Sequence, residues 1–528
     1  MDKKVIIESG KTALGIEFGS TRVKAVLIDE DCGVLASGSY EWENQLLDGY
    51  WTYSIDEIHT ALRTCYSNLK ADVKDKYGVS LKKIGAIGIS GMMHGYMAFD
   101  KNGKLLVPFR TWRNTTTEKA SAILTEKLGF NIPQRWTASH LYEAVIDAEA
   151  HVPEIAYVTT LVGYVHYMLT GVNAVGIGEA SGIFPIDSTK NDYDENMIAV
   201  FEKLAEEKGF SKKLREILPK VLLAGENAGC LTEKGVALLD ESGELETGIP
   251  FAPGEGDAGT GMVATNSVRV KTGNISAGTS VFLMLVLEKS LSKVYPEIDM
   301  VTTPTGKPVA MVHCNNCTSD INAWGGVLHS FASMLGSDVK KGKVYDLMYE
   351  AASKADYDCG GLVSYNYYSG EPVTGFKEGR PLLLRTPESK FTFENFMLAE
   401  LYSAMATLRI GFELLKDEKV SIDELYGHGG FYIYPGVGQQ ITAAALDCDV
   451  SVMKTAGEGG PYGMALLALY SLCGEGKALE DFLKEKAFKD AECTTVSADE
   501  ERKKGFDSFF KKYKDGLSVE AEAVKSIK

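Results

Sequence analysis

Two short segments of the sequence combine a glycine with hydroxyl residues, as phosphate-binding turns do. Gly19-Ser20-Thr21 and Gly278-Thr279-Ser280 each follow an apolar residue. Glycine lets backbone N–H groups approach a ligand closely, and the hydroxyl groups add further donors. Either segment taken singly is more simply explained by ordinary turn chemistry. Their occurrence as a pair, half a chain apart, favours a pair of turns that hold the phosphates of a nucleotide.

A carboxylate stands in a third Gly-rich loop. Asp257 lies between Gly254 and Gly261, with glycines on both sides. A kinase that acts on a hydroxyl needs one carboxylate within hydrogen-bond reach of the attacking oxygen, because that oxygen must lose its proton. An Asp in a Gly-rich loop is also a common turn former, so this loop by itself leaves both interpretations open.

Two further glycine clusters lie toward the C-terminal end. Gly427 to Gly430 follow a predicted strand at residues 423–426 and precede a predicted helix at residues 441–446. Such a junction admits phosphates or a flat ring, which suits the adenosine part of ATP, although a crowded strand-to-helix turn explains it equally well. The cluster from Glu458 to Gly463 opens a predicted helix, and we expect its glycines to serve helix packing.

Strands and helices in alternation are predicted to position these residues. The sequence around each glycine-hydroxyl turn reads as a strand, a tight turn and a second strand. Helical spacing of apolar residues predicts helices, and a short apolar run predicts a strand at residues 83–90. The predicted helices are at residues 56–69, 115–128, 398–415 and 501–513. The repeated hairpin therefore predicts an α/β fold of two similar domains that face each other.

The domain boundary is expected just after the Gly- and Pro-rich stretch at residues 247–262. The expected first domain, residues 1–263, contains the first hairpin and Asp257. The expected second domain, residues 264–528, contains the second hairpin and a C-terminal helical tail.

Composition excludes several classes of protein. The chain has 528 residues, 55 Lys and Arg, 72 Asp and Glu and a formal net charge of −17. This length needs more than one core, and the acidic excess argues against nucleic-acid binding. Neither a signal peptide nor an apolar run long enough to span a membrane is evident, so we expect a cytoplasmic protein without a membrane partner. Its nine scattered cysteines predict reduced thiols, and the single Cys314-x-x-Cys317 is expected to be structural.

Together the motifs resemble the FGGY family of carbohydrate kinases, within the fold superfamily of actin, hexokinase and the heat-shock chaperone ATPases. They occur in the family's order over residues 12–475. They are Gly15 to Thr21, Ser90 to Gly95, Trp112 with Asn114, Leu169 to Gly171, Glu179 to Gly182, the loop around Asp257, Ser276 to Ser280 and Gly427 to Gly430. The resemblance implies two ribonuclease-H-like domains around a central ATP cleft.

The resemblance also implies the reaction, which is phosphorylation of a terminal hydroxyl of a ketose or polyol by ATP with Mg²⁺. Asp257 matches the family's general base, and Met93-His94 match the sugar-binding pair of xylulose kinases. Trp112 and Asn114 complete the implied sugar site, and Glu17 matches the Mg²⁺ residue. The implied nucleotide-binding residues are Gly19, Ser20, Thr21, Gly278, Thr279, Gly429 and Gly430.

Several positions depart from the family pattern. Glu17 replaces the usual Asp, Met92 replaces a Gln, and Asn114 replaces an Asp, while an Arg that usually follows is absent from Thr115-Thr116-Thr117. An amide brings no charge to the sugar, so the substrate's hydroxyl pattern can differ from that of xylulose.

Two alternatives stay open on these grounds. One is a non-metabolic ATPase related to actin or to the chaperones, and the other is a sugar-binding regulator that has lost catalysis. Whether the protein forms a homodimer, and which sugar carbon it phosphorylates, are also left open by the sequence.

Overall fold

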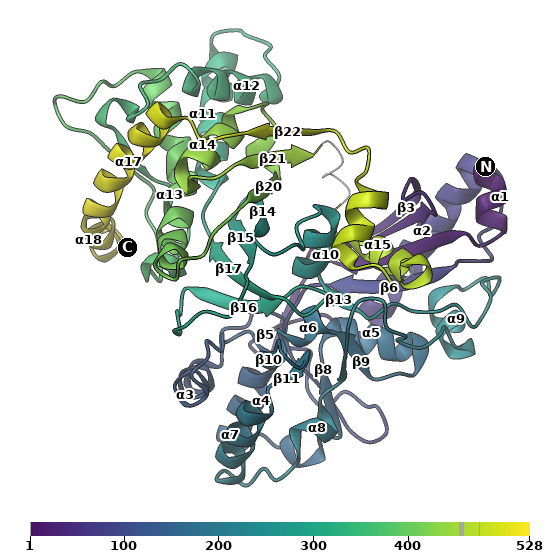
Figure 1. Ribbon diagram of the computed structural model, residues 1–528. Helices are drawn as coiled ribbons and strands as arrows, with labels where there is room; N and C mark the ends of the chain where they lie inside the picture. Colours follow the sequence, from purple (N-terminus) through teal and green to yellow (C-terminus); the bar gives the residue numbers. More distant parts are fainter. Residues whose placement is uncertain (1, 454–458, 475) are drawn as a thin grey trace. The chain divides into compact units, whose positions relative to one another are not determined.

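The computed structural model describes residues 2–453, 459–474 and 476–528. Its contacts divide the chain into two compact units (Figure 1). The first unit comprises residues 1–268, 288–309 and 458–490, and the second comprises residues 269–287, 310–457 and 491–528. The sequence predicted one division after residue 263. In the structure two later segments return to the first unit, because their strand and helices pack there.

A five-stranded sheet organises the first unit, with the strand order β13-β6-β1-β2-β3. The bounds are β1 Thr12–Phe18, β2 Arg22–Asp29, β3 Val34–Glu41, β6 Ala86–Gly91 and β13 Glu255–Gly256. β1 and β2 form an antiparallel hairpin, whereas β6 runs parallel to both β1 and β13. Phe18 pairs with Gly91, and Gly91 pairs with Gly256. The residues that follow these three strands therefore emerge at one edge of the sheet.

Helices cover this sheet through close backbone contacts. α2 (Ile55–Tyr77) packs on β2 and β3, and α15 (Gly459–Cys473) packs on β1 and β6. A Cβ placed on Gly15 would lie 2.1 Å from the Pro461 carbonyl oxygen, so only glycine lets α15 approach β1 this closely. Leu14, Ile16 and Phe18 are fully buried in the resulting core.

The other elements of the first unit surround this sheet. They are α1 Lys3–Glu8, β4 Gln45–Leu47, β5 Tyr50–Thr52, β7 Met97–Phe99, α3 Glu118–Leu128, α4 Thr137–Ile146, β8 Tyr157–Thr159, α5 Leu161–Thr170, β9 Ala174–Gly176, α6 Ile177–Ala180, β10 Ile186–Asp187, β11 Asp192–Tyr193, α7 Glu195–Glu206, α8 Leu214–Ile217, β12 Lys220–Leu222, α9 Glu233–Leu239, α10 Asp257–Ala264, β16 Ile298–Thr302 and α16 Leu479–Phe482.

The second unit repeats the hairpin arrangement. Its strands run in the order β17-β15-β14-β20-β21-β22, and β14 pairs antiparallel with β15 and parallel with β20. The strand bounds are β14 Thr272–Ala277, β15 Val281–Val286, β17 Pro308–Cys314, β20 Glu424–His428, β21 Val450–Met453 and β22 Cys493–Val496. Since β1, β2 and β6 have the same relationship, the predicted duplication extends to a third strand.

Helices and one small sheet complete the second unit. They are α11 Ser319–Met334, α12 Lys341–Ala352, β18 Val363–Tyr365, β19 Leu382–Leu384, α13 Phe393–Asp417, α14 Val437–Leu446, α17 Glu500–Asp515 and α18 Leu517–Ser526. The predicted surface helix at the C-terminal end corresponds to α17, whose Phe506, Phe509, Phe510 and Tyr513 are buried on one face.

Two further observations bear on the expected class of protein. All nine cysteines are free thiols. In the part of the chain that the structure describes, no helix is both long and apolar enough to cross a membrane.

Candidate active site

The first glycine-hydroxyl turn joins β1 to β2 and is held by aromatic donors. Gly19 N donates to Arg22 O at 3.1 Å, which closes the turn. The Trp42 indole donates to Gly19 O at 2.7 Å, and the Tyr53 hydroxyl donates to Ser20 O at 2.5 Å. Because its carbonyls are held in this way, the turn is rigid, and its hydroxyl side chains remain at the surface.

Glu17 lies near the end of β1, in a space that a glycine keeps open. A Cβ on Gly460 would lie only 1.4 Å from Glu17 Oε2. Burial raises the pKa of Glu17 to about 7, and the negative charge of Asp257 adds to this shift while Lys24 opposes it. The extra methylene of Glu, compared with Asp, is thus accommodated at the first residues of α15.

Lys24 is a residue that the sequence analysis missed. It is the direct partner of Glu17 in the β1–β2 ladder, so both side chains lie on the same face of the hairpin. Its side chain is exposed. The alternating pattern of β2 could have identified it, since a cation opposite the predicted metal-binding carboxylate can attract phosphates.

Asp257 is the first residue of α10 and follows β13 directly. Its Oδ1 accepts hydrogen bonds from Ala258 N at 2.9 Å and from Met93 N at 3.4 Å. The residue reaches the surface of the first unit, yet protein atoms crowd its carboxylate, and this desolvation raises its pKa to about 6. At neutral pH the group is largely ionised and still basic enough to accept a proton.

Glu17 and Asp257 together fit a magnesium site. Each carboxylate disfavours ionisation of a close neighbour, and a divalent cation relieves such repulsion. Among the residues that the structure describes, no group of three or more His, Cys, Asp or Glu side chains could hold a metal ion. Mg²⁺ usually binds one or two carboxylates and takes its remaining ligands from water and phosphate, so these two carboxylates are a chemically suitable pair for it.

Met93 and His94 follow β6 at the same sheet edge. His94 adopts a left-handed backbone conformation with φ of 70°, and its Nδ1 lies 3.4 Å from Gly182 O. Its ring stacks on Trp136 with centroids 6.0 Å apart. Burial, aided by the charge of Arg135, holds the pKa of His94 well below its usual value. The imidazole is therefore neutral and can both donate and accept a hydrogen bond.

Trp112 and Asn114 differ in how accessible their side chains are to a sugar. Trp112 is 37% exposed, and its indole donates to Ser20 Oγ at 3.1 Å. Asn114 is buried, with its Oδ1 accepting from Trp51 N at 2.8 Å and its Nδ2 donating to Trp51 O and Thr111 O at 2.9 Å. The amide is occupied by backbone groups, so it holds the loop that displays Trp112. A direct contact of Asn114 with the sugar stays a prediction.

The predicted nucleotide-binding residues of the second unit also share one sheet edge. Gly278 and Gly429 follow the parallel strands β14 and β20. A Cβ on Gly429 would lie 2.4 Å from Ala277 O, whereas one on Gly278 or Gly430 would meet no atom within 4 Å. Gly429 thus allows the two segments to touch, and the other two glycines leave open space for a ligand.

The Cys314-x-x-Cys317 segment and the residue after it are hydrogen-bonded to the turn of the second hairpin. Cys317 N donates to Thr279 O at 2.9 Å, and the Thr318 hydroxyl donates to Gly278 O at 2.7 Å. Both thiols are buried and free. The segment therefore positions the turn between β14 and β15, as expected of a structural motif.

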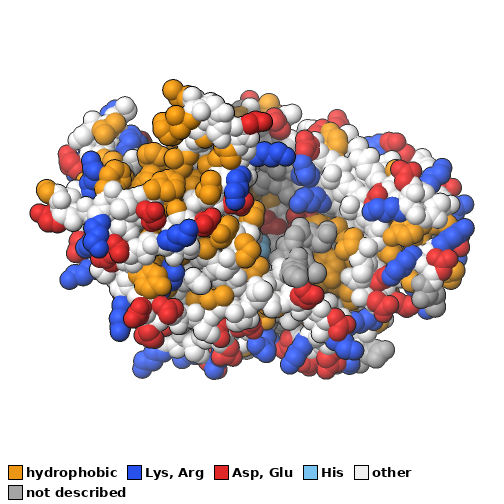
Figure 2. Space-filling model, turned by 90° about the horizontal axis from the view of Figure 1, so that it is seen from above, with side chains coloured by type: hydrophobic (Ala, Val, Ile, Leu, Met, Phe, Trp, Pro, Cys, Tyr) orange, Lys and Arg blue, Asp and Glu red, His pale blue; other side chains and the backbone are white. Residues whose placement is uncertain are grey.

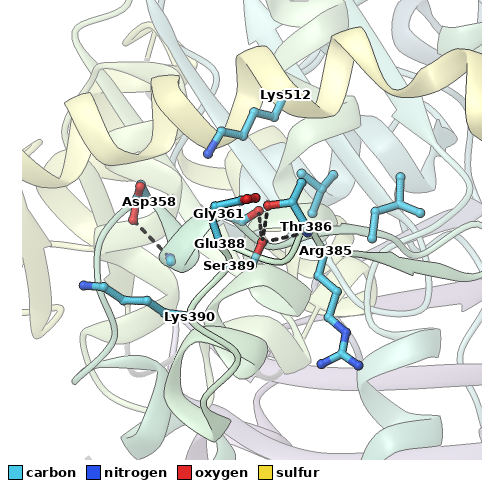
Figure 3. A pocket seen from close by; sticks show the side chains of 11 residues that line it. Asp358, Gly361, Arg385, Thr386, Glu388, Ser389, Lys390 and Lys512 are labelled. Atoms are coloured by element: carbon cyan, nitrogen blue, oxygen red, sulfur yellow. Dashed lines mark hydrogen bonds between the residues drawn. The ribbon is translucent and has the colours of Figure 1, made fainter.

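A separate pocket of about 520 Å³ lies within the second unit (Figure 3). None of the predicted site residues lines it. Lys390 and Arg385 extend to different sides in the view, and Asp358 and Glu388 line the pocket as well. With charges of both signs and no convergent set of donors, the pocket is not part of the candidate active site.

Comparison with known families gives two matches that together span most of the chain. Residues 12–264 match the N-terminal domain of the FGGY family of carbohydrate kinases, and residues 273–472 match its C-terminal domain.

Individual relatives are similar over nearly the whole length. A xylulose kinase of Haemophilus influenzae is 25% identical over 482 residues, covering 88% of this chain and 91% of that protein. A crystal structure described as a xyloylose kinase from Brucella ovis superposes with a TM-score of 0.77 at 19% identity, covering 97% of this chain and all of the other. A gluconate kinase from Lactobacillus acidophilus gives the same TM-score at 17% identity, covering 97% and 99%. At such identities the structural matches establish the fold.

Proposed function

This chain belongs to the FGGY family of carbohydrate kinases, and from that membership we propose that it transfers phosphate from ATP to a terminal hydroxyl of a ketose, with a xylulose-like ketose favoured. One observation carries the proposal. Three neighbouring strands, β1, β6 and β13, reach the same edge of the first sheet. Glu17 lies near the end of β1, Met93 lies just after β6, and Asp257 directly follows β13. The residues that we propose as the metal-binding carboxylate, the sugar-binding pair and the general base therefore lie at the same edge of this sheet. The ketose is favoured because curated relatives are named xylulose kinases.

Asp257 is the proposed general base. Its carboxylate accepts a hydrogen bond from the attacking hydroxyl and takes the proton as the new P–O bond forms, while the bond from the γ-phosphorus to the bridging oxygen breaks and ADP leaves with that oxygen. Two backbone N–H groups fix the carboxylate, and its pKa of about 6 keeps it ionised at neutral pH. Since phosphoryl transfer needs little covalent work from the protein, orientation and electrostatics supply most of the acceleration.

Glu17 is the proposed magnesium residue. When bound, Mg²⁺ offsets negative charge on the transferring phosphates. Lys24 lies beside Glu17 across the hairpin and adds a fixed positive charge on the same face. This arrangement suits a protein of net charge −17, because the attraction for ATP must come from local groups.

The two Gly-rich turns are the proposed phosphate-binding elements. We assign ATP binding to the turns that contain Gly19, Ser20, Thr21, Gly278 and Thr279, and to Gly429 and Gly430. The second-unit glycines that leave open space support this assignment.

Met93, His94 and Trp112 are the proposed sugar-binding residues. The neutral imidazole of His94 can pair with a hydroxyl in either sense, and Trp112 offers an exposed apolar face. Asn114 contributes by fixing the Trp112 loop, which explains how an amide can replace the carboxylate at this position.

An ADP-release screen tests the proposal. Pentuloses, hexuloses, heptuloses and pentitols are offered with Mg-ATP to the wild-type protein and to Asp257→Asn. We expect one class to release ADP in proportion to sugar, and we expect Asp257→Asn to lose about 10²–10⁴-fold in turnover while still binding ATP. Sugar-independent ATP hydrolysis would favour an actin-like or chaperone-like ATPase, which family membership disfavours. Sugar-induced thermal stabilisation without ADP release would instead indicate a lapsed regulator.

Two further proposals concern context. The protein is proposed to act in the cytoplasm, where ATP is available, and to form a homodimer. α11 carries the exposed apolar residues Val327, Phe331 and Met334, and the exposed Leu335 follows it directly. Hydrophobic side chains also gather on part of the face that Figure 2 shows. Sedimentation of the wild type and of Phe331→Ser tests the dimer, since a dimer through α11 should weaken in the variant.

A further inference from the structure

A strand from the middle of the chain joins the first unit beside the sugar-binding residues. β16 (Ile298–Thr302) is anchored at its end, where Thr302 N donates to Ser181 Oγ at 3.1 Å and Thr302 Oγ1 donates to Ile177 O at 3.1 Å. These partners belong to α6 and its C-cap, and Gly182 follows them directly. Gly182 O is the atom that His94 Nδ1 approaches. β16 is therefore fixed to the segment that supports His94.

β16 contributes Asp299, which forms an ion pair with Arg135. Asp299 Oδ1 also accepts from Asn131 Nδ2 at 3.1 Å, and Asn131 Nδ2 donates to Ile298 O at 3.0 Å. The Asp299 side chain is 11% exposed, whereas that of Arg135 is 25% exposed. The aspartate thus holds the guanidinium in place, and Arg135 is the more exposed side chain of the pair.

Arg135 is tied to His94 by three observations. Gly95 N donates to Arg135 O at 2.9 Å, so the backbones beside the two residues are joined. Trp136, the next residue, stacks on the His94 ring. The charge of Arg135 also lowers the pKa of His94, which requires the two side chains to be close. Contacts therefore lead from Asp257 to Met93, and from His94 to Arg135.

The chemistry of the pair favours a hydroxyl ligand. A guanidinium has five N–H donors in a planar fork. One carboxylate cannot accept from all five, so donors remain for a ligand. Because Asp299 balances the charge of Arg135, the pair offers directional hydrogen bonds without a net positive charge. A neutral polyhydroxy compound suits it better than a sugar acid does.

We propose that Arg135, held by Asp299, determines sugar specificity by donating hydrogen bonds to a hydroxyl at the end of the ketose remote from the phosphorylated hydroxyl. The inference rests on the proposed function, since Asp257 must mark the reacting end. It assigns a role to β16 that neither the phosphate-binding turns nor the general base requires.

The test compares selectivity for two ketoses that differ by one hydroxymethyl group, a pentulose and a hexulose. The ratio of their kcat/KM values is measured for the wild type, Arg135→Gln, Arg135→Lys and Asp299→Asn. We expect Arg135→Gln to change the ratio by about tenfold or more, through KM with kcat within about threefold, because a site built for a hydroxyl discriminates through its donors. Arg135→Lys, which keeps the charge but loses the fork, should show a smaller change in the same direction.

Arg215→Gln is the matched control. Arg215 is also in the first unit and paired with carboxylates, Asp192 and Glu195, on its surface. We expect its ratio to stay at the wild-type value. A ratio is measured within one preparation, so any inactive fraction cancels from it, and a merely destabilised variant cannot mimic the effect.

The outcomes separate this inference from the proposed function. A wild-type protein that phosphorylates no ketose refutes the proposed function and this inference with it. A wild-type protein that phosphorylates ketoses, with ratios unchanged within about twofold in Arg135→Gln and Asp299→Asn, refutes only the specificity role.

Discussion

The contact between Glu17 and Gly460 allows a sharp test of how the active site is built. In Gly460→Ala the new methyl carbon would lie 1.4 Å from Glu17 Oε2. Ordinary contact begins near 3.4 Å, so the carboxylate must move by about 2 Å. The obstructed atom is the end of a flexible side chain, and a new rotamer can relieve the clash. We therefore expect the free energy of unfolding to change by less than about 1 kcal/mol.

Activity should respond far more strongly than stability. A displacement of about 1 Å in a reacting constellation can lower the rate by about 10²-fold, and Glu17 would move further than that. In coupled assays for ADP release, we expect kcat/KM of Gly460→Ala to fall by about 10²-fold. We also expect the KM for Mg-ATP to rise. The melting temperature of Gly460→Ala, measured on the same preparation, should be close to that of the wild type.

A second substitution should rescue the first. Asp is one methylene shorter than Glu, so Glu17→Asp retracts the carboxylate from the Gly460 methyl group. In the double variant we expect the loss caused by Gly460→Ala to shrink by about tenfold or more, which is the coupling expected of side chains in direct contact.

Gly261→Ala supplies the matched control. Gly261 lies in α10, close in sequence to Asp257, and a Cβ there meets no atom within 4 Å. This variant should keep wild-type activity and stability. Full activity in Gly460→Ala, or losses that simply multiply in the double variant, would refute the reasoning that this glycine makes room for the carboxylate.

Three more outcomes follow from the charges of the first unit. Because the pKa of Asp257 is raised to about 6, kcat/KM should fall about tenfold per pH unit below that value, and a profile flat down to pH 4 would exclude it as the base. Burial raises the pKa of Glu255 to about 8, so the folded state binds its proton more tightly than the unfolded state does, and stability is lost as pH rises from about 4.5 toward 8. Melting temperatures of Glu255→Gln should therefore depend less on pH across this window. Lys24→Ala should raise KM for ATP by about tenfold, whereas Lys24→Arg should keep most of the affinity, as initial rates at varied ATP will show.

Local patterns predicted the hairpins, because each is specified within a few residues. A glycine between two apolar runs suffices to indicate a tight turn, and both turns are observed at the residues expected. The class of fold followed from the repetition of this unit. The positions of α13 and α17 were likewise indicated by apolar residues at helical spacing.

Contacts between distant segments could not be predicted in the same way. Nothing in residues 298–302 specifies that Asp299 meets Arg135, since this pairing depends on the path of the intervening chain. The same holds for Asn114, whose amide is occupied by the backbone of Trp51 and Thr111. Its residue type suggests a sugar ligand, which stays a prediction, whereas its burial and its backbone hydrogen bonds could not be predicted from the sequence.

The return of α15 to the first unit explains why the two carboxylates have a fixed relationship. Gly15 allows this helix to approach β1, which carries Glu17, while a Cβ on Gly463 would lie 2.0 Å from Thr260 O in α10, the helix that begins with Asp257. One helix thus packs against both elements at backbone distance. Glycine is required at each contact because even a methyl group would separate the elements. The first unit is discontinuous in sequence because of this packing, in which a late segment of the chain holds two early ones in register.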